Sequence, residues 1–489
     1  MGTEPQRLHV VFFPLMAAGH MIPTLDIAKL FAAHHVKTTI VTTPLNAPTF
    51  LKPLQSYTNI GPPIDVQVIP FPAKEAGLPE GVENFEHFTS DEMSLKFLKA
   101  AELLEEPLIQ VLERCKPKAD CLVADMLLPF ATEVAAKFDI PRLVFHGSCC
   151  FALSVMDAFI KYQPHKDVSN DDEEFVIPHL PHEIKITRMQ LNEGVKQNKQ
   201  DSMWMDVLGR ALESEIKSYG VIVNSFYELE AEYADFYRKV MGRKMWQIGP
   251  VSLCNRENEA KFQRGKDSSI DENACLKWLD SKKPNSVIYV CFGSLTEVSL
   301  LQLHEIAKGL QASEQDFIWV IRRSNTNGEE TEDIFPKGFE ERTKGKGLII
   351  KGWAPQVLIL DHEAVGGFVT HCGWNSTLEG ISCGVPMVTW PAFAEQFYIE
   401  KLVTEILKTG IPVGSKHWNR TIECNVKWED IKEVVRRLMI EEEGVKIRSR
   451  ALKLKNMARK AIDEGGSSYV ELTSLIQELS NYKLKSNGF

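Results

Sequence analysis

Two polar residues in the first half of the chain follow apolar runs that are typical of buried strands. His20 stands in Gly19-His20-Met21-Ile22-Pro23, shortly after the run Leu8–Pro14, and Asp125 directly follows Cys121–Ala124. Ligand sites of open parallel α/β sheets form at the carboxyl ends of strands. An imidazole takes up a proton near neutral pH, and a carboxylate can orient it and stabilise its charged form. A lone His in a loop is more often structural, so only the two residues together predict a general base.

The densest group of polar and aromatic residues lies between Trp353 and Gln396. It contains the segments Trp353-Ala-Pro-Gln356, His371-Cys-Gly-Trp-Asn-Ser-Thr-Leu-Glu379 and Pro391-Ala-Phe-Ala-Glu395-Gln396. The middle segment predicts the end of a strand, a glycine turn and then a helix that begins near Asn375. The free N–H groups of a helix N-terminus carry partial positive charge and bind anions. This window therefore predicts a site for a diphosphate.

The side chains around this helix start have the right chemistry for such a site. Asn375 and Ser376 are short and polar, and His371 adds a cation when it is protonated. Glu379 is four residues beyond Asn375 and shares its helix face, so its carboxylate is placed to accept from the paired hydroxyls of a sugar. Trp353 offers a flat face on which a base can stack.

Each of these features also has a plain structural explanation. Asn375 and Ser376 can simply cap a helix, and Trp353 and Trp374 can be core aromatics. Zinc binding by His371 and its neighbouring cysteine is disfavoured, because no partner pair stands at ligand spacing. Any one feature alone is better explained structurally, whereas their concentration in one window favours a ligand site.

Apolar runs rich in β-branched residues alternate with helical patterns along the chain. In the first half the expected strands are Leu8–Pro14, Lys37–Thr42, Val66–Ile69, Cys121–Ala124, Arg142–Phe145 and Val221–Asn224. In the second half they are Val287–Phe292, Phe317–Ile321, Leu348–Lys351, Gly367–Val369 and Met387–Trp390. Runs that are apolar on both faces are typical of parallel strands covered by helices. The predicted fold class is therefore α/β with doubly wound sheets.

Helices and linkers complete this organisation. A helix is expected over Thr24–Ala33, and Ser299 with Gln302 predicts a capping box at the start of another. The polar stretch Asn255–Asp271 is the best linker in the sequence. Near the end, two glycines separate the helical pattern Val445–Ile462 from a last amphipathic stretch, Tyr469–Leu479. We therefore expect two similar α/β domains, with a final helix that docks elsewhere.

Composition excludes several classes of protein. The 489 residues include 56 Lys and Arg against 66 Asp and Glu, a net charge of −10, which disfavours nucleic-acid or anionic-membrane partners. No apolar run approaches the ~20 residues that cross a bilayer, and the run Leu8–Ala18 lacks the basic flank of a signal peptide. The ten cysteines show no paired spacing and are expected to be reduced thiols of a cytoplasmic protein.

These motifs together resemble the signature box of the plant family 1 UDP-dependent glycosyltransferases, and the whole chain is similar to that family. The subgroup it resembles most is that of the phenolic O-glucosyltransferases acting on scopoletin, flavonoids and betanidin. The resemblance implies the GT-B fold: two Rossmann-like parallel-sheet domains facing across a cleft, with a C-terminal helix that crosses back to the first domain. The implied divisions are an acceptor domain at 1–250, a linker at 251–271, a UDP-sugar domain at 272–464 and a returning helix at 465–489.

The resemblance also implies roles for individual residues of the window. Trp353 would stack on uracil while the Ala354 backbone reads its edge, and Gln356 with Glu379 would hold the ribose. The diphosphate would be bound by Ser294, His371, Asn375 and Ser376, and the sugar by Trp374, Glu395 and Gln396. The family's usual Asp-Gln pair is Glu395-Gln396 here, which keeps the carboxylate at a longer reach. A terminal Gln in this box goes with UDP-glucose as donor.

The same resemblance assigns the base to His20, with Asp125 as the buried carboxylate that orients it. A phenol with a pKa of about 10 is protonated at neutral pH, so attack needs a base. The oxygen would then attack the anomeric carbon opposite UDP and invert its configuration. The resemblance implies no cofactor beyond the co-substrate UDP-glucose and no metal; the sequence has no Asp-x-Asp motif.

Other classes and finer details stay open at this stage. The chain lacks the glycine fingerprint of nicotinamide dehydrogenases and the nucleotide phosphate loop. A sequon at Asn375 falls inside the expected phosphate site, which favours the cytoplasm over a secretory compartment. The resemblance places the acceptor pocket near His20 and around the segments 85–97, 126–130 and 145–151, although core packing explains their apolar residues equally well. Gly19 and Ser148 are candidates for contact with either the acceptor or the sugar. A triterpenoid or steroid acceptor and a non-catalytic UDP-sugar-binding protein are the alternatives; the protein is expected to be a monomer.

Overall fold

The computed structural model of the chain describes residues 7–57, 61–88, 90–196, 203–322 and 335–486. Contacts divide it into two compact units. Unit 1 takes its residues from Met1–Cys149, Gln200–Lys266 and Ala461–Phe489, and unit 2 from Cys150–Lys199 and Asp267–Lys460.

This division differs from the expected boundaries at residues 250, 271 and 464. The segment Cys150–Lys199 groups with unit 2, because helix α6 (Cys150–Tyr162) contacts α16 (Gln396–Lys401). The backbone N–H of Trp418 also donates to the carbonyl of Met189 at 2.9 Å. The segment Cys150–Lys199 therefore packs with unit 2, although it belongs to the first half of the sequence.

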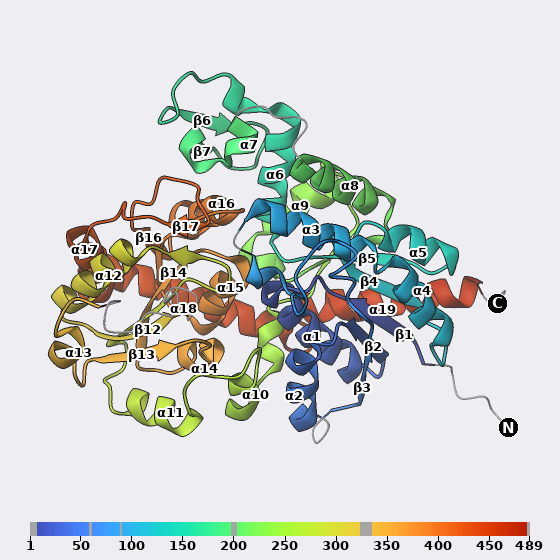
Figure 1. Cartoon of the computed structure of the whole chain (residues 1–489), viewed down its shortest axis with the longest axis horizontal. Helices are drawn as coiled ribbons and strands as arrows, with labels where there is room; N and C mark the ends of the chain where they lie inside the picture. The colour runs from blue at the N-terminus through green and yellow to red at the C-terminus, as the bar shows by residue number, and fades with distance from the viewer. Residues whose placement is uncertain (1–6, 58–60, 89, 197–202, 323–334, 487–489) are drawn as a thin grey trace. The chain divides into compact units, whose positions relative to one another are not determined.

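Unit 1 is built on a seven-stranded parallel sheet (Figure 1). In spatial order its strands are β3 (Ile64–Val68), β2 (Lys37–Thr42), β1 (His9–Phe13), β4 (Cys121–Asp125), β5 (Arg142–His146), β8 (Gly220–Val223) and β9 (Met245–Gln247). The strand order reverses beside β1, where β2 lies on one side and β4 on the other. This is the switch point at which doubly wound sheets form their sites.

Both faces of this sheet are covered, as its apolar strands predict. Val11 and Phe13 point into one core, whereas Val10 and Phe12 point into the other. The edge strand β3 is largely exposed, and so departs from the expectation of burial on both faces. The helical elements of unit 1 are α1 (Ala18–Ala33), α2 (Ala47–Tyr57), η1 (Phe85–His87), α3 (Asp91–Glu102), α4 (Glu105–Arg114), α5 (Ala131–Lys137), α8 (Met203–Lys217), η4 (Tyr227–Leu229), α9 (Ala231–Lys239), η5 (Val251–Cys254), α10 (Asn258–Phe262) and α19 (Ser467–Ser486).

Helix α1 begins six residues earlier than the sequence predicts. Its first turn closes on the carbonyl of Ala17, which accepts from the N–H groups of His20 and Met21 at 2.9 Å. Pro23 therefore lies inside the helix and does not mark its start. As a result His20 sits in the first turn of a helix, not in a loop.

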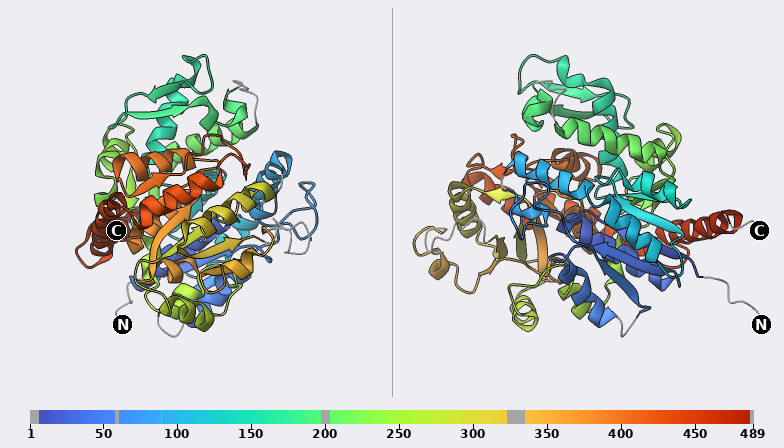
Figure 2. Two further views of the ribbon diagram at one scale, coloured as in Figure 1. Left: turned by 90° about the vertical axis from the view of Figure 1, so that its left-hand side faces the viewer. Right: turned by 45° about the vertical axis from the view of Figure 1, so that its right-hand side comes forward.

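The last helix, α19, packs on unit 1, as the fold class predicts. Leu472, Leu475 and Leu479 join the core beneath β1 and β5, and the helix contacts β9. Figure 2 shows this helix in red, beside the blue strands that begin the chain. Full burial of three leucines contributes about 1.5–3 kcal/mol for each side chain.

Unit 2 is built on a six-stranded parallel sheet (Figure 1). In spatial order its strands are β13 (Gly347–Lys351), β12 (Asp316–Ile321), β10 (Val287–Cys291), β14 (Val365–Thr370), β15 (Met387–Thr389) and β16 (Gly410–Pro412). Two small sheets accompany it, the pair β11 (Glu297–Val298) with β17 (Thr421–Ile422) and the hairpin β6 (Glu174–Ile177) with β7 (Ile184–Thr187).

The helical elements of unit 2 lie before, between and after its strands. Besides α6 and α16 they are η2 (Pro164–Lys166), η3 (Arg188–Gln190), α7 (Glu193–Lys196), α11 (Glu272–Asp280), α12 (Leu300–Ser313), α13 (Phe339–Arg342), α14 (Gln356–Leu360), α15 (Trp374–Cys383), η8 (Leu402–Ile406), α17 (Trp428–Met439) and α18 (Glu442–Ile462). Ser299 caps α12 through the N–H of Gln302. The Gln302 side chain does not return to the cap but donates to the Val426 carbonyl at 2.8 Å, so only half of the predicted capping box forms.

Among the described helices, none is long and apolar enough to cross a membrane.

Candidate active site

His20 and Asp125 meet at the edge of the unit 1 sheet where β1 and β4 have their carboxyl ends. The Nδ1 atom of His20, in the first turn of α1, lies 2.6 Å from Oδ2 of Asp125, the last residue of β4. Strand β4 pairs with β1, whose end leads into α1, and this pairing brings two residues 105 positions apart together. The structure thus brings the two predicted side chains into hydrogen-bond contact.

Asp125 is held rigidly as an anion. Its side chain is fully buried, and its other oxygen accepts from the N–H of Leu127 at 3.0 Å. Burial alone would raise the pKa of Asp125, but the charge and hydrogen bond of His20 and the Leu127 N–H together hold it below its ordinary value. An ionised carboxylate only accepts hydrogen bonds, so Nδ1 of His20 carries the proton and Nε2 is the basic nitrogen. The His20 side chain is 24% exposed, which leaves it within reach of a substrate.

The strand beside Asp125 supplies a close backbone contact that sequence reasoning missed. A Cβ atom placed on Gly147, after β5, would lie 3.2 Å from Cε1 of His20 and 3.5 Å from its Nε2. The Gly147 backbone therefore packs against the imidazole. The one signal for this contact in the sequence is the glycine that directly follows a buried strand.

The other residues expected near the base differ in their exposure and in their hydrogen-bond partners. Gly19 is exposed beside His20 in the first turn of α1. The hydroxyl of Ser148 is buried and forms no hydrogen bond within the described part of the chain. His146 does not point to a ligand: its Nε2 lies 2.6 Å from Oε2 of Glu215, and both side chains are buried.

Five apolar residues of the expected acceptor segments pack in the core. Phe88 and Phe97 are buried, with ring centroids 5.2 Å apart, and Leu128, Phe145 and Phe151 are buried as well. The core-packing alternative therefore holds for these five residues. Partly exposed side chains remain within these segments at Phe85, Met126, Leu127 and Phe130.

In unit 2 the predicted donor-site residues gather at one edge of the sheet. Ser294 follows β10, Trp353 and Ala354 follow β13, His371 follows β14, and the segment with Glu395 and Gln396 follows β15. Because these strands are parallel, their carboxyl ends share one edge. Trp353 is half-buried, and Ser269 fixes its backbone by accepting from the Trp353 N–H at 3.0 Å and donating to its carbonyl at 2.8 Å.

Helix α15 begins at this edge without a side-chain cap. Its N-cap is Gly373, and its first turn contains no acidic residue. Asn375 and Ser376 lie inside this first turn, so they do not cap the helix. The N–H groups of the first turn therefore have no cap from the N-cap residue, which is the arrangement that an anion site at a helix N-terminus requires. The Trp374 indole is almost fully buried, so any contact of Trp374 with a sugar has to come from its backbone.

A hydrogen-bonded cluster joins α14 to α15. The Gln356 amide donates to Oε2 of Glu379 at 2.7 Å and to the Ser376 hydroxyl at 3.0 Å. Three predicted donor-site residues thus lie together, with the buried carboxylate of Glu379 oriented by Gln356. Glu395 is half-buried, and Oε1 of Gln396 accepts from the N–H groups of Ala392 and Phe393, which leaves its amide nitrogen for a ligand.

His371 is held between two glycine backbones. Added Cβ atoms would lie 2.5 Å from the ring at Gly293 and 2.4 Å at Gly373. Burial lowers the pKa of His371 to about 4, so the imidazole is neutral near pH 7. The expectation of a cation is thereby corrected: His371 offers this site an N–H donor and no charge. Its Nδ1 atom has no partner within the described residues.

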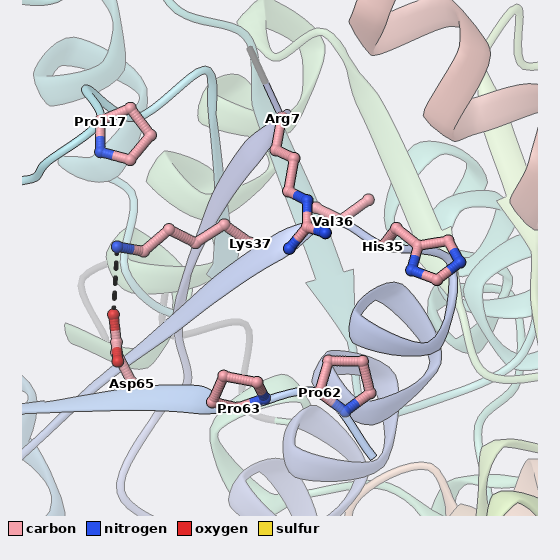
Figure 3. Close-up of a pocket in the computed structure, with 8 residues that line it drawn as sticks. All are labelled: Arg7, His35, Val36, Lys37, Pro62, Pro63, Asp65 and Pro117. Atoms are coloured by element: carbon pink, nitrogen blue, oxygen red, sulfur yellow. Dashed lines mark ion pairs between the residues drawn. The ribbon is translucent and has the colours of Figure 1, made fainter. Parts of the chain in front are cut away.

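A cavity of about 600 Å³ lies elsewhere in unit 1, at the amino ends of the strands (Figure 3). Its lining residues are Arg7, His35, Val36, Lys37, Pro62, Pro63, Asp65 and Pro117. They precede or begin β1, β2, β3 and β4, whereas His20 and Asp125 lie at carboxyl ends. This cavity is therefore not part of the candidate active site. Within the described ranges, no group of three or more His, Cys, Asp or Glu side chains is placed to hold a metal ion.

Known proteins resemble this chain over nearly its whole length. The family described as UDP-glucoronosyl and UDP-glucosyl transferase matches residues 187–407. A scopoletin glucosyltransferase of Nicotiana tabacum is 56% identical over 476 residues, which cover 97% of this chain and 98% of the tobacco protein. A UDP-glucose flavonoid 3-O-glucosyltransferase 7 of Fragaria ananassa is 53% identical over 485 residues, 97% of each chain.

The solved structures agree with the fold. The crystal structure of Glycyrrhiza uralensis UGT73P12 with glycyrrhetinic acid 3-O-monoglucuronide matches with a TM-score of 0.89 at 39% identity, over 98% of this chain and 97% of the other. The match covers both units, so the fold class that the sequence predicts is confirmed.

Proposed function

The chain belongs to the plant family 1 UDP-glycosyltransferases, which have the GT-B fold, and from that premise we propose that it is an inverting O-glucosyltransferase. It transfers glucose from UDP-glucose to a hydroxyl of a small phenolic metabolite, such as a coumarin or a flavonoid. The observation that carries the proposal is the contact between His20 and Asp125, 2.6 Å long and built on the carboxyl edge of the first sheet.

His20 acts as the general base of the reaction. Asp125 fixes the proton on Nδ1, so Nε2 receives the proton of the acceptor hydroxyl as the oxygen attacks. The imidazolium that forms is stabilised by the adjacent carboxylate, which stays ionised because its pKa is depressed. General-base help of this kind contributes typically ~10²–10⁴-fold to the rate.

Unit 2 binds the donor. The N–H groups that begin α15 bind the diphosphate, together with Ser294, Asn375, Ser376 and the neutral His371. Trp353 and Ala354 bind the uracil. Gln356 and Glu379 bind the ribose hydroxyls, while Glu395, Gln396 and the backbone of Trp374 contact glucose. Aligned N–H groups stabilise the negative charge that develops on the departing diphosphate.

The transfer itself is one displacement. A bond forms between the acceptor oxygen and the anomeric carbon, the bond from that carbon to the β-phosphate oxygen breaks, and the electron pair leaves with UDP. The acceptor proton passes to His20, and the configuration of the anomeric carbon inverts. No enzyme nucleophile and no metal ion take part.

Phenols are the proposed acceptors because two relatives more than 50% identical over nearly the whole chain are named for scopoletin and for a flavonoid. A triterpenoid acceptor is the second candidate. It is favoured by the solved relative that holds glycyrrhetinic acid 3-O-monoglucuronide, although that protein is only 39% identical. A phenol is smaller and flatter than a triterpenoid, so the two acceptor classes can be separated by a direct assay.

The test is an acceptor panel read by mass spectrometry. The enzyme is mixed with UDP-glucose and, in separate reactions, with a coumarin, a flavonol and a triterpenoid, each with and without excess EDTA. A hexose added to the phenols in both conditions is the expected result. Transfer to the triterpenoid alone would favour the second candidate, and loss of transfer in EDTA would contradict the metal-free mechanism. Binding of UDP-glucose with no product from any acceptor would indicate a non-catalytic binding protein.

The enzyme is further proposed to be a cytoplasmic monomer. All ten cysteines are free thiols in the structure, as expected in a reducing compartment. A glycan on Asn375 would occupy the first turn of α15, where the diphosphate is proposed to bind. Light scattering of the purified protein and fluorescence microscopy of a tagged chain in plant cells test these two points.

A further inference from the structure

The helix that carries His20 has no cap of its own. Ala17 occupies the N-cap position of α1 and offers no side-chain hydrogen bond, and the first turn contains no acidic residue. Alanine is among the poorest N-cap residues. The positive end of the helix dipole therefore lies next to His20, the third residue of α1. No side chain of the first turn or of the N-cap residue offsets this positive charge.

A carboxylate from a distant segment supplies the missing cap. Oε1 of Glu86, in η1, accepts from the N–H of Ala18 at 3.2 Å. The Glu86 side chain is 5% exposed, and its other oxygen forms an ion pair with Lys266 in the segment after α10. Glu86 is 68 residues from Ala18 in the sequence, so no local sequence motif predicts this cap.

The backbone around Glu86 holds it in this place. The N–H of Phe85 donates to the carbonyl of Met16 at 2.9 Å, so η1 is attached to the loop that leads into α1. Oδ1 of Asn84 accepts from the Glu86 N–H at 2.9 Å. Glu86 is thus fixed on both sides.

The position of Glu86 matters for the chemistry of the base. A helix N-terminus carries roughly half a positive charge, which disfavours a cation within the first turn. The proposed reaction forms such a cation on His20. A negative charge at the helix end opposes this effect and keeps the imidazole more basic.

We propose that Glu86 is a positioning residue for the base: its carboxylate caps the catalytic helix and offsets the positive helix end beside His20, while Lys266 moderates its charge. This inference rests on the proposed function, since it assumes that His20 takes up a proton in the reaction. Glu86 itself does not touch the reacting atoms.

Several charged and titratable groups surround His20, and their contributions have to be separated. Those of the neighbouring elements are Asp125 of β4, Arg142 and His146 of β5, Glu86 of η1, Lys266, and, two turns along α1, Asp26 with its partner Arg264. Only the pair of Glu86 and Lys266 acts through the helix end. Its two members carry opposite charges, so removing either one has an opposite effect on the basicity of His20.

The experiment compares the pH dependence of kcat/KM for the wild type, Glu86→Gln and Lys266→Gln. The acid limb of the profile reports the protonation of His20 in the free enzyme. In Glu86→Gln the amide oxygen can still accept from Ala18, but the charge is lost, so the limb moves to lower pH by ~0.2–0.7 units. In Lys266→Gln the limb moves to higher pH, by less, because Lys266 is more exposed than Glu86.

Controls separate this effect from stability and from net charge. Glu80→Gln removes the same charge from an exposed site of the same segment and should leave the limb in place. An unmoved limb in Glu86→Gln, or shifts of the same sign in Glu86→Gln and Lys266→Gln, would overturn the inference, because a purely structural cap changes the melting temperature but not the limb. An inactive wild type contradicts the proposed function, whereas an active wild type with an unmoved limb in Glu86→Gln contradicts this inference alone.

Discussion

Nδ1 of His20 and Oδ2 of Asp125 are 2.6 Å apart, and the carboxylate is fully buried while the imidazole is partly exposed. This asymmetry assigns a role to each residue. The buried member stays charged and fixes the tautomer, and the exposed member presents its other nitrogen to a substrate. The pair lies in unit 1, whereas every residue proposed to hold UDP lies in unit 2. Acid–base chemistry and donor binding are therefore expected to fail independently when single residues are changed.

Replacing His20 with Ala should abolish transfer and leave UDP binding intact. The variant loses the base, which is worth ~10²–10⁴-fold in rate, but it changes no residue of the donor site. Turnover is measured by the release of UDP, and affinity for UDP by calorimetry. A His20→Ala variant that no longer binds UDP would contradict this division of roles.

Replacing Gly147 with Ala should lower kcat without changing affinity for UDP. The new Cβ would lie 3.2 Å from Cε1 of His20, closer than ordinary carbon contacts, so the imidazole has to turn or shift. Misplacement of a catalytic group by about 1 Å can cost up to ~10²-fold, and we expect a loss of about 10-fold or more. Steady-state kinetics with saturating UDP-glucose measure the change.

The matched control for this variant is Gly209→Ala, because Gly209 lies exposed in α8 with open space around its Cα. It should keep full activity. Equal activity of Gly147→Ala and the wild type would show that the contact with His20 does not constrain the imidazole.

Replacing Glu379 with Ala should weaken UDP binding. The Gln356 amide loses its 2.7 Å acceptor, and the ribose loses a charged one. Hydrogen bonds to charged groups contribute about 1.5–3 kcal/mol, which corresponds to a loss of roughly 10- to 100-fold in affinity. Calorimetry with UDP measures it, and Glu423→Ala, an exposed carboxylate of the same unit, should bind as tightly as the wild type. Unchanged affinity in Glu379→Ala would remove Glu379 from the proposed ribose site.

The sequence predicted the carboxyl ends of the strands better than it predicted the contacts around them. Strand ends are local features, since an apolar run stops and a polar or glycine residue follows. This is why the sequence predicts candidate site residues at Asp125, at His371 and in the segment that begins at Trp353. Short strands with little apolar pattern, such as β9 and β16 with three residues each, were missed for the same reason.

Contacts between segments that are distant in the sequence could not be predicted from it. The packing of Gly147 on His20 depends on the pairing of β1, β4 and β5. The cap from Glu86 to Ala18 depends on the attachment of η1 to the loop before α1, so both contacts appear only when the chain is folded. Long-range burial also explains the neutral state of His371. Its residue type suggested a cation, but the enclosure that lowers its pKa comes from two glycine backbones on different loops.

Replacing Leu475 with Ala should destabilise unit 1. The side chain is fully buried in the core that α19 shares with β1 and β5, and truncations of this kind cost about 2–5 kcal/mol. Urea unfolding followed by tryptophan fluorescence measures the loss. Val470→Ala, at an exposed position of the same helix, should change stability by less than ~0.5 kcal/mol. Equal stability of the two variants would mean that α19 is not held by its apolar face.

Replacing Glu215 with Gln should remove a large part of the acid sensitivity of unit 1. Glu215 is buried and accepts from His146 at 2.6 Å, from the Tyr237 hydroxyl at 2.8 Å and from Arg243 at 2.6 Å. Burial alone would raise the pKa of Glu215, but these three partners lower it to about 2 from its ordinary value near 4.5. A folded-state pKa below the unfolded one means that the stabilisation is complete above pH ~4.5 and is lost as pH falls towards 2.

A difference of this size corresponds to stability on the order of 3 kcal/mol. The free energy of unfolding in urea is measured at pH 7 and pH 3 for the wild type, for Glu215→Gln and for Glu213→Gln, an exposed carboxylate on the same helix. The wild type and Glu213→Gln should lose stability over this range. Glu215→Gln should be less stable at pH 7, because His146 and Arg243 lose their anionic partner, and should lose less on acidification. If Glu215→Gln loses as much stability as the wild type between pH 7 and pH 3, the buried carboxylate is not the source of the acid sensitivity.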